Sequence, residues 1–285
     1  MIETYKRTEL SKLREACGFQ FSKALGQNFL VDRNIIEKIL DGADVSETDD
    51  IIEIGAGAGA LTVPLARRAR FVYAVEIDRR IIPMLRLAAE GLDNVEIVHA
   101  DFLLLDPRTL TERYKLIGNL PYSITTPILA RAIEGRGAGM PERMVFMVQK
   151  EVGERLLAPP GSRTYGAISV LVQYYCAAER ICDVSREVFV PKPNVDSMVI
   201  RFTPYNDLAD DPEIAREMFR IVKAGFGMRR KTLRNSLGRL GYTEGTLLAA
   251  LEAIGIDPAR RAETLGARDY YTLAKTLMNG MCGKL

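Results

Sequence analysis

An apolar run that ends in a glycine-rich turn limits the fold of this chain more than any other feature. Residues 51–59 read Ile-Ile-Glu-Ile-Gly-Ala-Gly-Ala-Gly, and a helical stretch, Leu61–Arg68, follows them. A strand that turns sharply through glycines into a helix is typical of the first unit of an open α/β sheet. The chain has 285 residues and is 47% apolar, which is enough for at least one full-sized core.

The same alternation of short β-rich runs and helical stretches continues along the chain. The strand candidates are Asp50–Ile54, Phe71–Ile77, Val95–His99, Lys115–Gly118, Met144–Gln149, Arg180–Val184 and Ser197–Phe202. Asp32 is a candidate cap for a helix over Ile35–Leu40. This order predicts a doubly wound, Rossmann-like α/β sheet.

The pattern changes near Tyr205, after a polar, turn-rich stretch. Beyond Pro212 the apolar residues Ile214, Met218 and Ile221 follow helical spacing, and no strand is evident. We therefore expect an α/β domain over residues 1–204 and a smaller all-helical domain over residues 205–285.

Two acidic residues near the predicted strand ends indicate what the glycine turn binds. Glu76 ends the strand after the turn, where a carboxylate can accept hydrogen bonds from both hydroxyls of a ribose, and Asp101 follows the next strand, where it can accept from an adenine amine. The glycine spacing is GxGxG, not the GxGxxG of pyrophosphate binders, and no P-loop lysine follows. A tight turn without a ligand is the alternative. We predict an adenosine site without phosphate binders, and hence S-adenosylmethionine.

The sequence Asn119-Leu120-Pro121-Tyr122 follows the fourth strand, beside the predicted methyl donor. The lone pair of an adenine N6 amine is delocalised, so two acceptors on its N–H bonds would favour a nucleophilic, pyramidal nitrogen. The Asn119 side-chain oxygen and the Leu120 carbonyl can be these acceptors, Pro121 stiffens the turn, and Tyr122 offers a face for the extruded base. Positioning can then supply most of the catalysis. A strand-ending proline turn is the alternative interpretation.

Phe189 is a candidate for covering the other face of the base. It lies in a proline-stiffened loop before the last strand. A buried anchor for that loop explains the same residue equally well.

Scarce histidine and scattered cysteine restrict the chemistry. His99 is the single histidine, and the four cysteines form no CxxC pair, so we expect no metal site and the reduced thiols of a cytoplasmic protein. The sequence contains no run of eighteen apolar residues, so it predicts no membrane span.

Basic residues gather in one stretch of a chain whose net charge is only +2. Between Arg216 and Arg239 the only acidic residue is Glu217. We predict a phosphate-binding surface there, and a solvated helix face is the alternative. The candidate RNA-binding residues are Arg229, Arg230, Lys231 and Arg234.

Five segments together resemble the ribosomal RNA small-subunit adenine N6,N6-dimethyltransferases, over nearly the whole chain. They are Gly26–Leu30, Glu53–Gly59, Asn119–Tyr122, Val190–Ser197 and Arg229–Asn235. Ser123 departs from the family, in which many members carry a second tyrosine after the first. The resemblance implies a set of cofactor-binding residues, namely Asn28, Leu30, Gly55, Glu76, Asp101 and Asn119.

The resemblance also implies the substrate, two adjacent adenosines in a hairpin loop near the 3′ end of small-subunit (16S) rRNA. Each would be dimethylated during ribosome biogenesis, with the immature small subunit as partner and a monomer as the working form. Related macrolide-resistance methyltransferases act on large-subunit rRNA with the same catalytic turn, but the Val190–Ser197 loop and the basic run favour the small-subunit group. An assembly factor that acts without methylating and a DNA adenine methyltransferase are the competing hypotheses.

Overall fold

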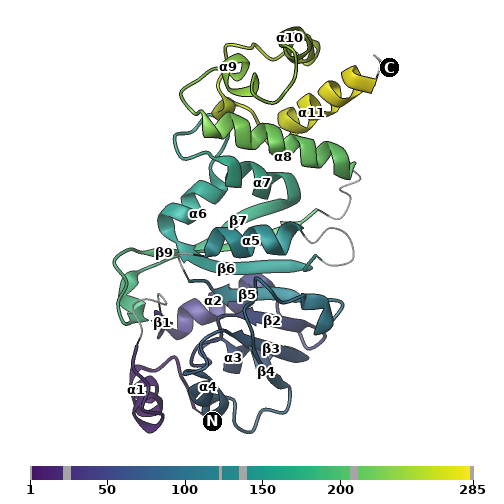
Figure 1. Ribbon diagram of the computed structural model, residues 1–285. Helices are drawn as coiled ribbons and strands as arrows, with labels where there is room; N and C mark the ends of the chain where they lie inside the picture. Colours follow the sequence, from purple (N-terminus) through teal and green to yellow (C-terminus); the bar gives the residue numbers. More distant parts are fainter. Residues whose placement is uncertain (1, 22–26, 122–123, 135–139, 206–210, 283–285) are drawn as a thin grey trace. The chain divides into compact units, whose positions relative to one another are not determined.

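A computed structural model describes residues 2–21, 27–121, 124–134, 140–205 and 211–282 (Figure 1). The chain forms two compact units, and the first contains residues 1–153 and 178–204. The second contains residues 154–177 and 205–285. The units therefore differ from the domains expected from the sequence in one segment, residues 154–177. Its Tyr174 ring packs edge-on against Phe219 and stacks on Tyr271, both of which lie beyond residue 205.

A seven-stranded sheet has the order β4-β3-β2-β5-β6-β9-β7, as Figure 1 shows. Its strands are β2 (Asp50–Ile54), β3 (Phe71–Glu76), β4 (Val95–His99), β5 (Lys115–Asn119), β6 (Arg143–Gln149), β7 (Cys176–Val184) and β9 (Ser197–Pro204). The first five pair in parallel, and β9 pairs antiparallel with β6. All seven predicted strands are present, and the doubly wound fold class is confirmed.

Strand β2 lies inside the sheet, between β3 and β5. All five of its residues are buried, and three of them are isoleucines, as is usual in a strand covered by helices on both faces. The helices of this unit are α1 (Arg7–Ala16), α2 (Arg33–Ala43), α3 (Thr62–Ala66), α4 (Ile82–Ala88) and α5 (Thr125–Glu134), and α6 (Lys150–Leu157) continues into the second unit. The Asp32 side chain caps α2 by accepting from the backbone N–H of Ile35 at 3.1 Å.

A second, two-stranded sheet was not predicted. Strand β1 (Phe29–Leu30) pairs antiparallel with β8 (Phe189–Val190), so that Leu30 lies opposite Phe189. The backbone N–H of Val31 donates to the carbonyl of Val188 at 2.8 Å and extends this pairing. The pairing joins the N-terminal segment to the loop before β9.

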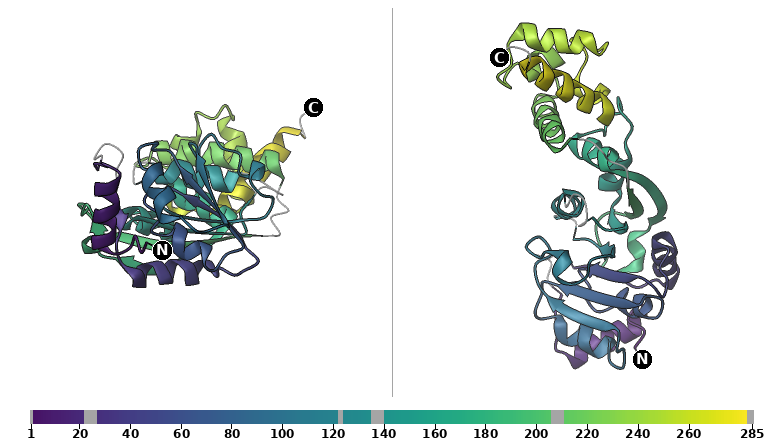
Figure 2. Two further views of the ribbon diagram at one scale, coloured as in Figure 1. Left: turned by 90° about the horizontal axis from the view of Figure 1, so that it is seen from below. Right: turned by 90° about the vertical axis from the view of Figure 1, so that its right-hand side faces the viewer.

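The second unit is helical, as predicted (Figure 2). Its helices are α7 (Ala167–Tyr175), α8 (Pro212–Gly227), α9 (Leu233–Leu237), α10 (Glu244–Ala253) and α11 (Ala267–Cys282). Ile214, Met218 and Ile221 face the interior of this unit, as their spacing predicted. The described residues from 211 to 282 contain no strand apart from an isolated bridge between Thr232 and Arg261.

None of the helices in the described part of the chain has the length and apolar character needed to cross a membrane.

Candidate active site

A cavity of about 320 Å³ lies at the carboxyl ends of β2, β3, β4 and β5. This is the edge of an open α/β sheet at which ligands are usually bound. The predicted cofactor-binding residues all line it, together with two of the catalytic turn: Asn28, Leu30, Gly55, Glu76, Asp101, Asn119, Leu120 and Pro121. The structure thus brings together residues that are widely separated in the sequence.

Glycines shape the turn that forms one wall of the cavity. Gly57 has a φ of +57°, a conformation that favours glycine, and a Cβ added to it would lie 3.3 Å from the Phe29 ring. Its backbone N–H donates to Glu76 Oε2 at 2.8 Å. A side chain at Gly57 would therefore be strained and crowded against Phe29, and the backbone of the turn contacts the predicted ribose-binding carboxylate directly.

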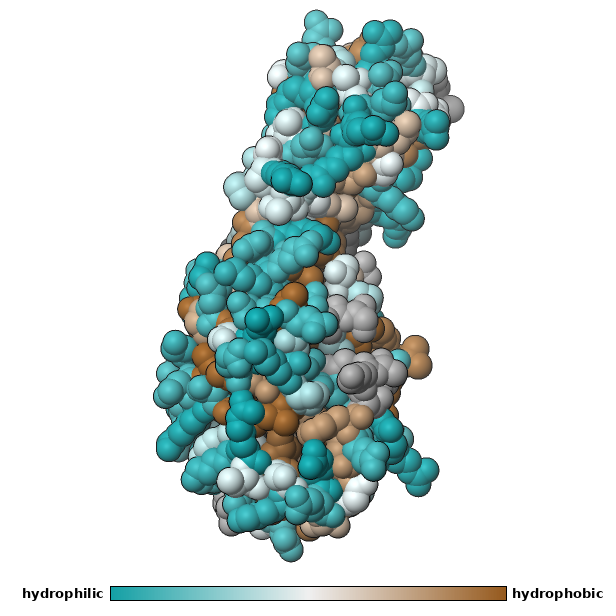
Figure 3. Space-filling view, turned by 90° about the vertical axis from the view of Figure 1, so that its left-hand side faces the viewer, coloured by the Kyte–Doolittle hydropathy of each residue, from teal (hydrophilic) through white to brown (hydrophobic). Residues whose placement is uncertain are grey.

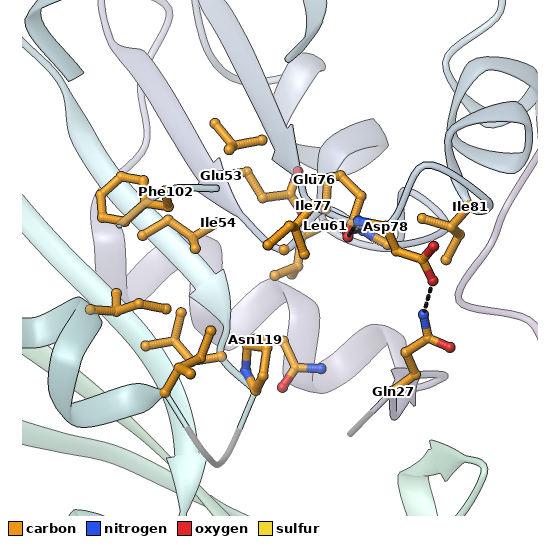
Figure 4. A pocket seen from close by; sticks show the side chains of 18 of the residues that line it. Gln27, Glu53, Ile54, Leu61, Glu76, Ile77, Asp78, Ile81, Phe102 and Asn119 are labelled. Atoms are coloured by element: carbon orange, nitrogen blue, oxygen red, sulfur yellow. Dashed lines mark hydrogen bonds between the residues drawn. The ribbon is translucent and has the colours of Figure 1, made fainter. Parts of the chain in front are cut away.

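Glu76 ends β3 and is held by two backbone hydrogen bonds. The backbone N–H of Asp78 donates to Oε1 at 2.8 Å, while Gly57 donates to Oε2. Burial raises the pKa of Glu76 above its ordinary value, and these hydrogen bonds act in the opposite direction. Figure 4 shows Glu76 on the opposite side of the cavity from Asn119. Asp101, after β4, accepts from the backbone N–H of Leu103 at 2.9 Å.

Asn119 is the last residue of β5, and its amide has a fixed partner. Nδ2 donates to the backbone carbonyl of Asn28 at 2.9 Å, so the amide presents Oδ1 on its other side. The backbone N–H of Leu120 donates to the carbonyl of Met147 at 3.1 Å, which anchors the turn to β6. The Pro121 carbonyl accepts from the N–H of Ile124 at 3.1 Å. Tyr122, the predicted stacking residue, lies outside the described residues.

Phe189 does not line the cavity. Its ring is 1% exposed and packs in the core with Leu30 and Ile36. The pairing of β8 with β1 turns this side chain inward, so the structure supports the buried loop anchor and not a cover for the base.

Three polar residues of the cavity wall were not predicted as site residues: Gln27, Glu53 and Asp78. Glu53 lies in the apolar strand β2, and Thr62 Oγ1 donates to its Oε2 at 2.5 Å. Burial raises the pKa of Glu53 to about 8. An acidic residue between Ile52 and Ile54 was the available signal. No comparable signal marks the hydrogen bond between Gln27 and Asp78, because they are 51 positions apart.

The four predicted RNA-binding residues differ in their surroundings. Arg229 donates to the Tyr165 carbonyl at 3.1 Å and lies 3.7 Å from a Glu263 carboxylate oxygen. Arg234 forms an ion pair with Glu244, in which Nε donates at 2.6 Å. Arg230 and Lys231 are exposed, and neither has an ion-pair partner in the described part of the chain. Among the four predicted residues, Arg230 and Lys231 are therefore the two cations without an ion-pair partner in the described part of the chain.

No three or more His, Cys, Asp or Glu residues in the described segments are grouped to hold a metal ion.

Comparison with solved structures defines the class of protein. A dimethyladenosine transferase from Plasmodium falciparum is 26% identical with a TM-score of 0.76, over 86% of this chain and 95% of that one. The 23S rRNA methyltransferase ErmE is 28% identical with a TM-score of 0.69, over 88% of this chain and 100% of that one. The protein is a methyltransferase with a Rossmann-like sheet.

The sequence defines the family more closely. A model described as ribosomal RNA adenine dimethylase matches residues 18–279. Ribosomal RNA small subunit methyltransferase A from Alkaliphilus metalliredigens is 45% identical over 90% of this chain and 92% of that protein. The chain belongs to the ribosomal RNA adenine dimethylase family.

The buried Glu53 carboxyl predicts a pH dependence of stability. Because its folded pKa of about 8 lies above the ordinary 4.5, its protonated form contributes stability below pH 4.5 that is lost as pH rises through 8. Glu53→Gln keeps an acceptor for Thr62 and removes this titration. We expect the melting temperature of the wild type to fall by about 5 °C more than that of the variant across this window.

The exposed Glu47 provides the control, since Glu47→Gln makes the same carboxyl-to-amide change at a surface position. Equal pH profiles for wild type and Glu53→Gln would contradict the assignment of a protonated Glu53.

Proposed function

We propose that the protein transfers methyl groups from S-adenosylmethionine to N6 of two adjacent adenosines in a hairpin loop near the 3′ end of 16S rRNA. The product is N6,N6-dimethyladenosine, formed during ribosome biogenesis in the cytoplasm. One observation carries the proposal: Glu76, Asp101 and the Asn119 turn line a single cavity. Because that cavity is built from one chain, we propose that a monomer is the working form.

The cavity residues fit the cofactor. Glu76 can accept from the ribose hydroxyls and Asp101 from the adenine amine, while Gly57 allows close approach of the backbone. No lysine or arginine is found among the described residues that line the cavity, which suits a cationic ligand. When bound, S-adenosylmethionine supplies an electrophilic methyl group.

The catalytic turn then holds the target amine. Asn119 Oδ1 and the Leu120 carbonyl accept from the two N6–H bonds, so that the nitrogen lone pair faces the methyl group. Each transfer would place a positive charge on N6, which would then release one proton to water. After the first transfer the amine would keep a single N–H, for which one of the two acceptors suffices. We propose that Tyr122 stacks on the base. Alignment of the reactants, without a strong base, supplies the rate enhancement.

Removing the Asn119 amide tests this role. Asn119→Ala should lower the methyl transfer rate at least about 100-fold, because one acceptor that acts in the transition state is lost. Cofactor binding, measured by calorimetry, should be partly retained. Asn34→Ala makes the same truncation at an exposed position of α2 and serves as control. A fully active Asn119→Ala enzyme would refute the proposed role of the turn.

The substrate is tested by incubating the protein with labelled cofactor and immature small subunits. We expect label in N6,N6-dimethyladenosine near the 3′ end of 16S rRNA. Large-subunit rRNA and duplex DNA are the parallel substrates, and preferential labelling of either would contradict the proposal. Normal subunit maturation with an inactive, RNA-binding variant would instead favour an assembly role.

We propose that the helical unit binds the RNA backbone through its uncompensated cations. Hydrophilic side chains cover most of this unit on the face seen in Figure 3. Arg230 and Lys231 are available for phosphates, whereas Arg229 and Arg234 already contact carboxylates. This arrangement supports Arg230 and Lys231 as the phosphate contacts among the four predicted residues.

Salt dependence distinguishes the two kinds of basic residue. Arg230→Ala and Lys231→Ala should each weaken RNA binding and lower the slope of log affinity against log salt by about 1. Arg216→Ala, on α8, removes a cation that is paired with Glu213 and should change the slope less. Equal slopes for wild type and all three variants would assign these residues to a solvated face.

A further inference from the structure

Residues Gln27–Leu30 form a strap along the cavity, and two hydrogen bonds fasten it. Gln27 Nε2 donates to Asp78 Oδ2 at 2.7 Å, and Asn119 Nδ2 donates to the Asn28 carbonyl at 2.9 Å. Figure 4 shows the Gln27–Asp78 bond at one end of the cavity. At its other end the strap joins the sheet through the pairing of β1 with β8.

The Asn28 carbonyl determines which way the Asn119 amide faces. A carbonyl oxygen can only accept, so the donor Nδ2 must point toward it and Oδ1 must point away. A flipped amide would oppose two acceptor oxygens and lose this hydrogen bond. The orientation of Oδ1 therefore depends on where the strap holds the Asn28 carbonyl.

Asp78 is a strong anchor for the strap. Its side chain is 6% exposed and forms an ion pair with Arg80 at 2.7 Å. The hydrogen bonds from Arg80 lower the pKa of Asp78, so Gln27 donates to a carboxylate, which strengthens the bond. The backbone N–H of Asp78 also donates to Glu76, which joins this anchor to the cofactor-binding carboxylate.

We propose that Gln27 is a positioning residue for methyl transfer: its bond to Asp78 holds the strap so that the Asn28 carbonyl orients the Asn119 amide. This inference rests on the proposed function. Gln27 would thus affect the rate of methyl transfer without touching the adenine amine.

Reversing the polarity of the Gln27–Asp78 bond tests the proposal. Gln27→Glu opposes two carboxylates and should lower kcat at saturating cofactor on the order of tenfold. Adding Asp78→Asn supplies an amide donor to the new carboxylate and should restore kcat to within about threefold of the wild type. Arg108→Gln breaks an equivalent arginine–aspartate pair, with Asp106 at 2.7 Å, at residues that do not line the cavity, and should change kcat by less than about threefold.

Two further measurements separate positioning from simple closure over the cofactor. Hydrogen exchange of residues 28–31 should rise in Gln27→Glu and return in the double variant. Asn119→Asp keeps an acceptor oxygen but replaces the donor facing Asn28, so exchange of this segment should rise there too. Unchanged exchange in Asn119→Asp would overturn the orienting role of the carbonyl.

The kinetic outcome is equally decisive. If Gln27→Glu raises the KM for cofactor but leaves kcat unchanged, or if the double variant is no better than Gln27→Glu, the positioning role is refuted. A wild-type protein that does not methylate 16S rRNA would instead refute the proposed function, so the two failures are distinguishable.

Discussion

Both carboxylate oxygens of Glu76 accept backbone N–H groups, and the geometry of the cavity depends on this pair of hydrogen bonds. Gly57 donates to one oxygen and Asp78 to the other. A buried carboxylate is costly unless such donors compensate for the lost water. Because Gly57 follows β2 and Asp78 follows β3, one side chain ties two strand ends together. Asp78 then receives Gln27 through its own carboxylate, which connects the N-terminal strap to the same centre.

The parts of the site that lie at strand ends could be predicted from the sequence. In a parallel sheet the carboxyl ends of all strands meet at one edge, so the position of a residue after its strand is enough to place it. Glu76, Asp101 and Asn119 were placed in this way, and they line one cavity. Asn28 and Leu30 could not be placed by this rule and were expected only from the family resemblance.

Contacts between distant residues could not be predicted, because local sequence does not encode partners. A phenylalanine at position 189 suits both a cover for the base and a buried anchor, so the sequence could not distinguish them. The pairing of β8 with β1 buries the side chain. The charge count between Arg216 and Arg239 omitted Glu244 and Glu263, which lie outside that window and contact Arg234 and Arg229. The hydrogen bond between Gln27 and Asp78 is seen only in the folded structure, because the two residues are 51 positions apart in the sequence.

Because the catalytic side chain is an amide, the protein must control its orientation and not its protonation. Asn119 does not titrate in the neutral range, so the relevant variable is its orientation, and orientation requires a partner that only accepts. A backbone carbonyl meets that requirement and cannot be altered by changing the side chain. The cavity wall itself carries carboxylates, which suit a sulfonium, whereas RNA phosphates need uncompensated cations. Arg230 and Lys231 belong to the other compact unit, so the chain provides the two opposing electrostatic environments in separate parts of its structure.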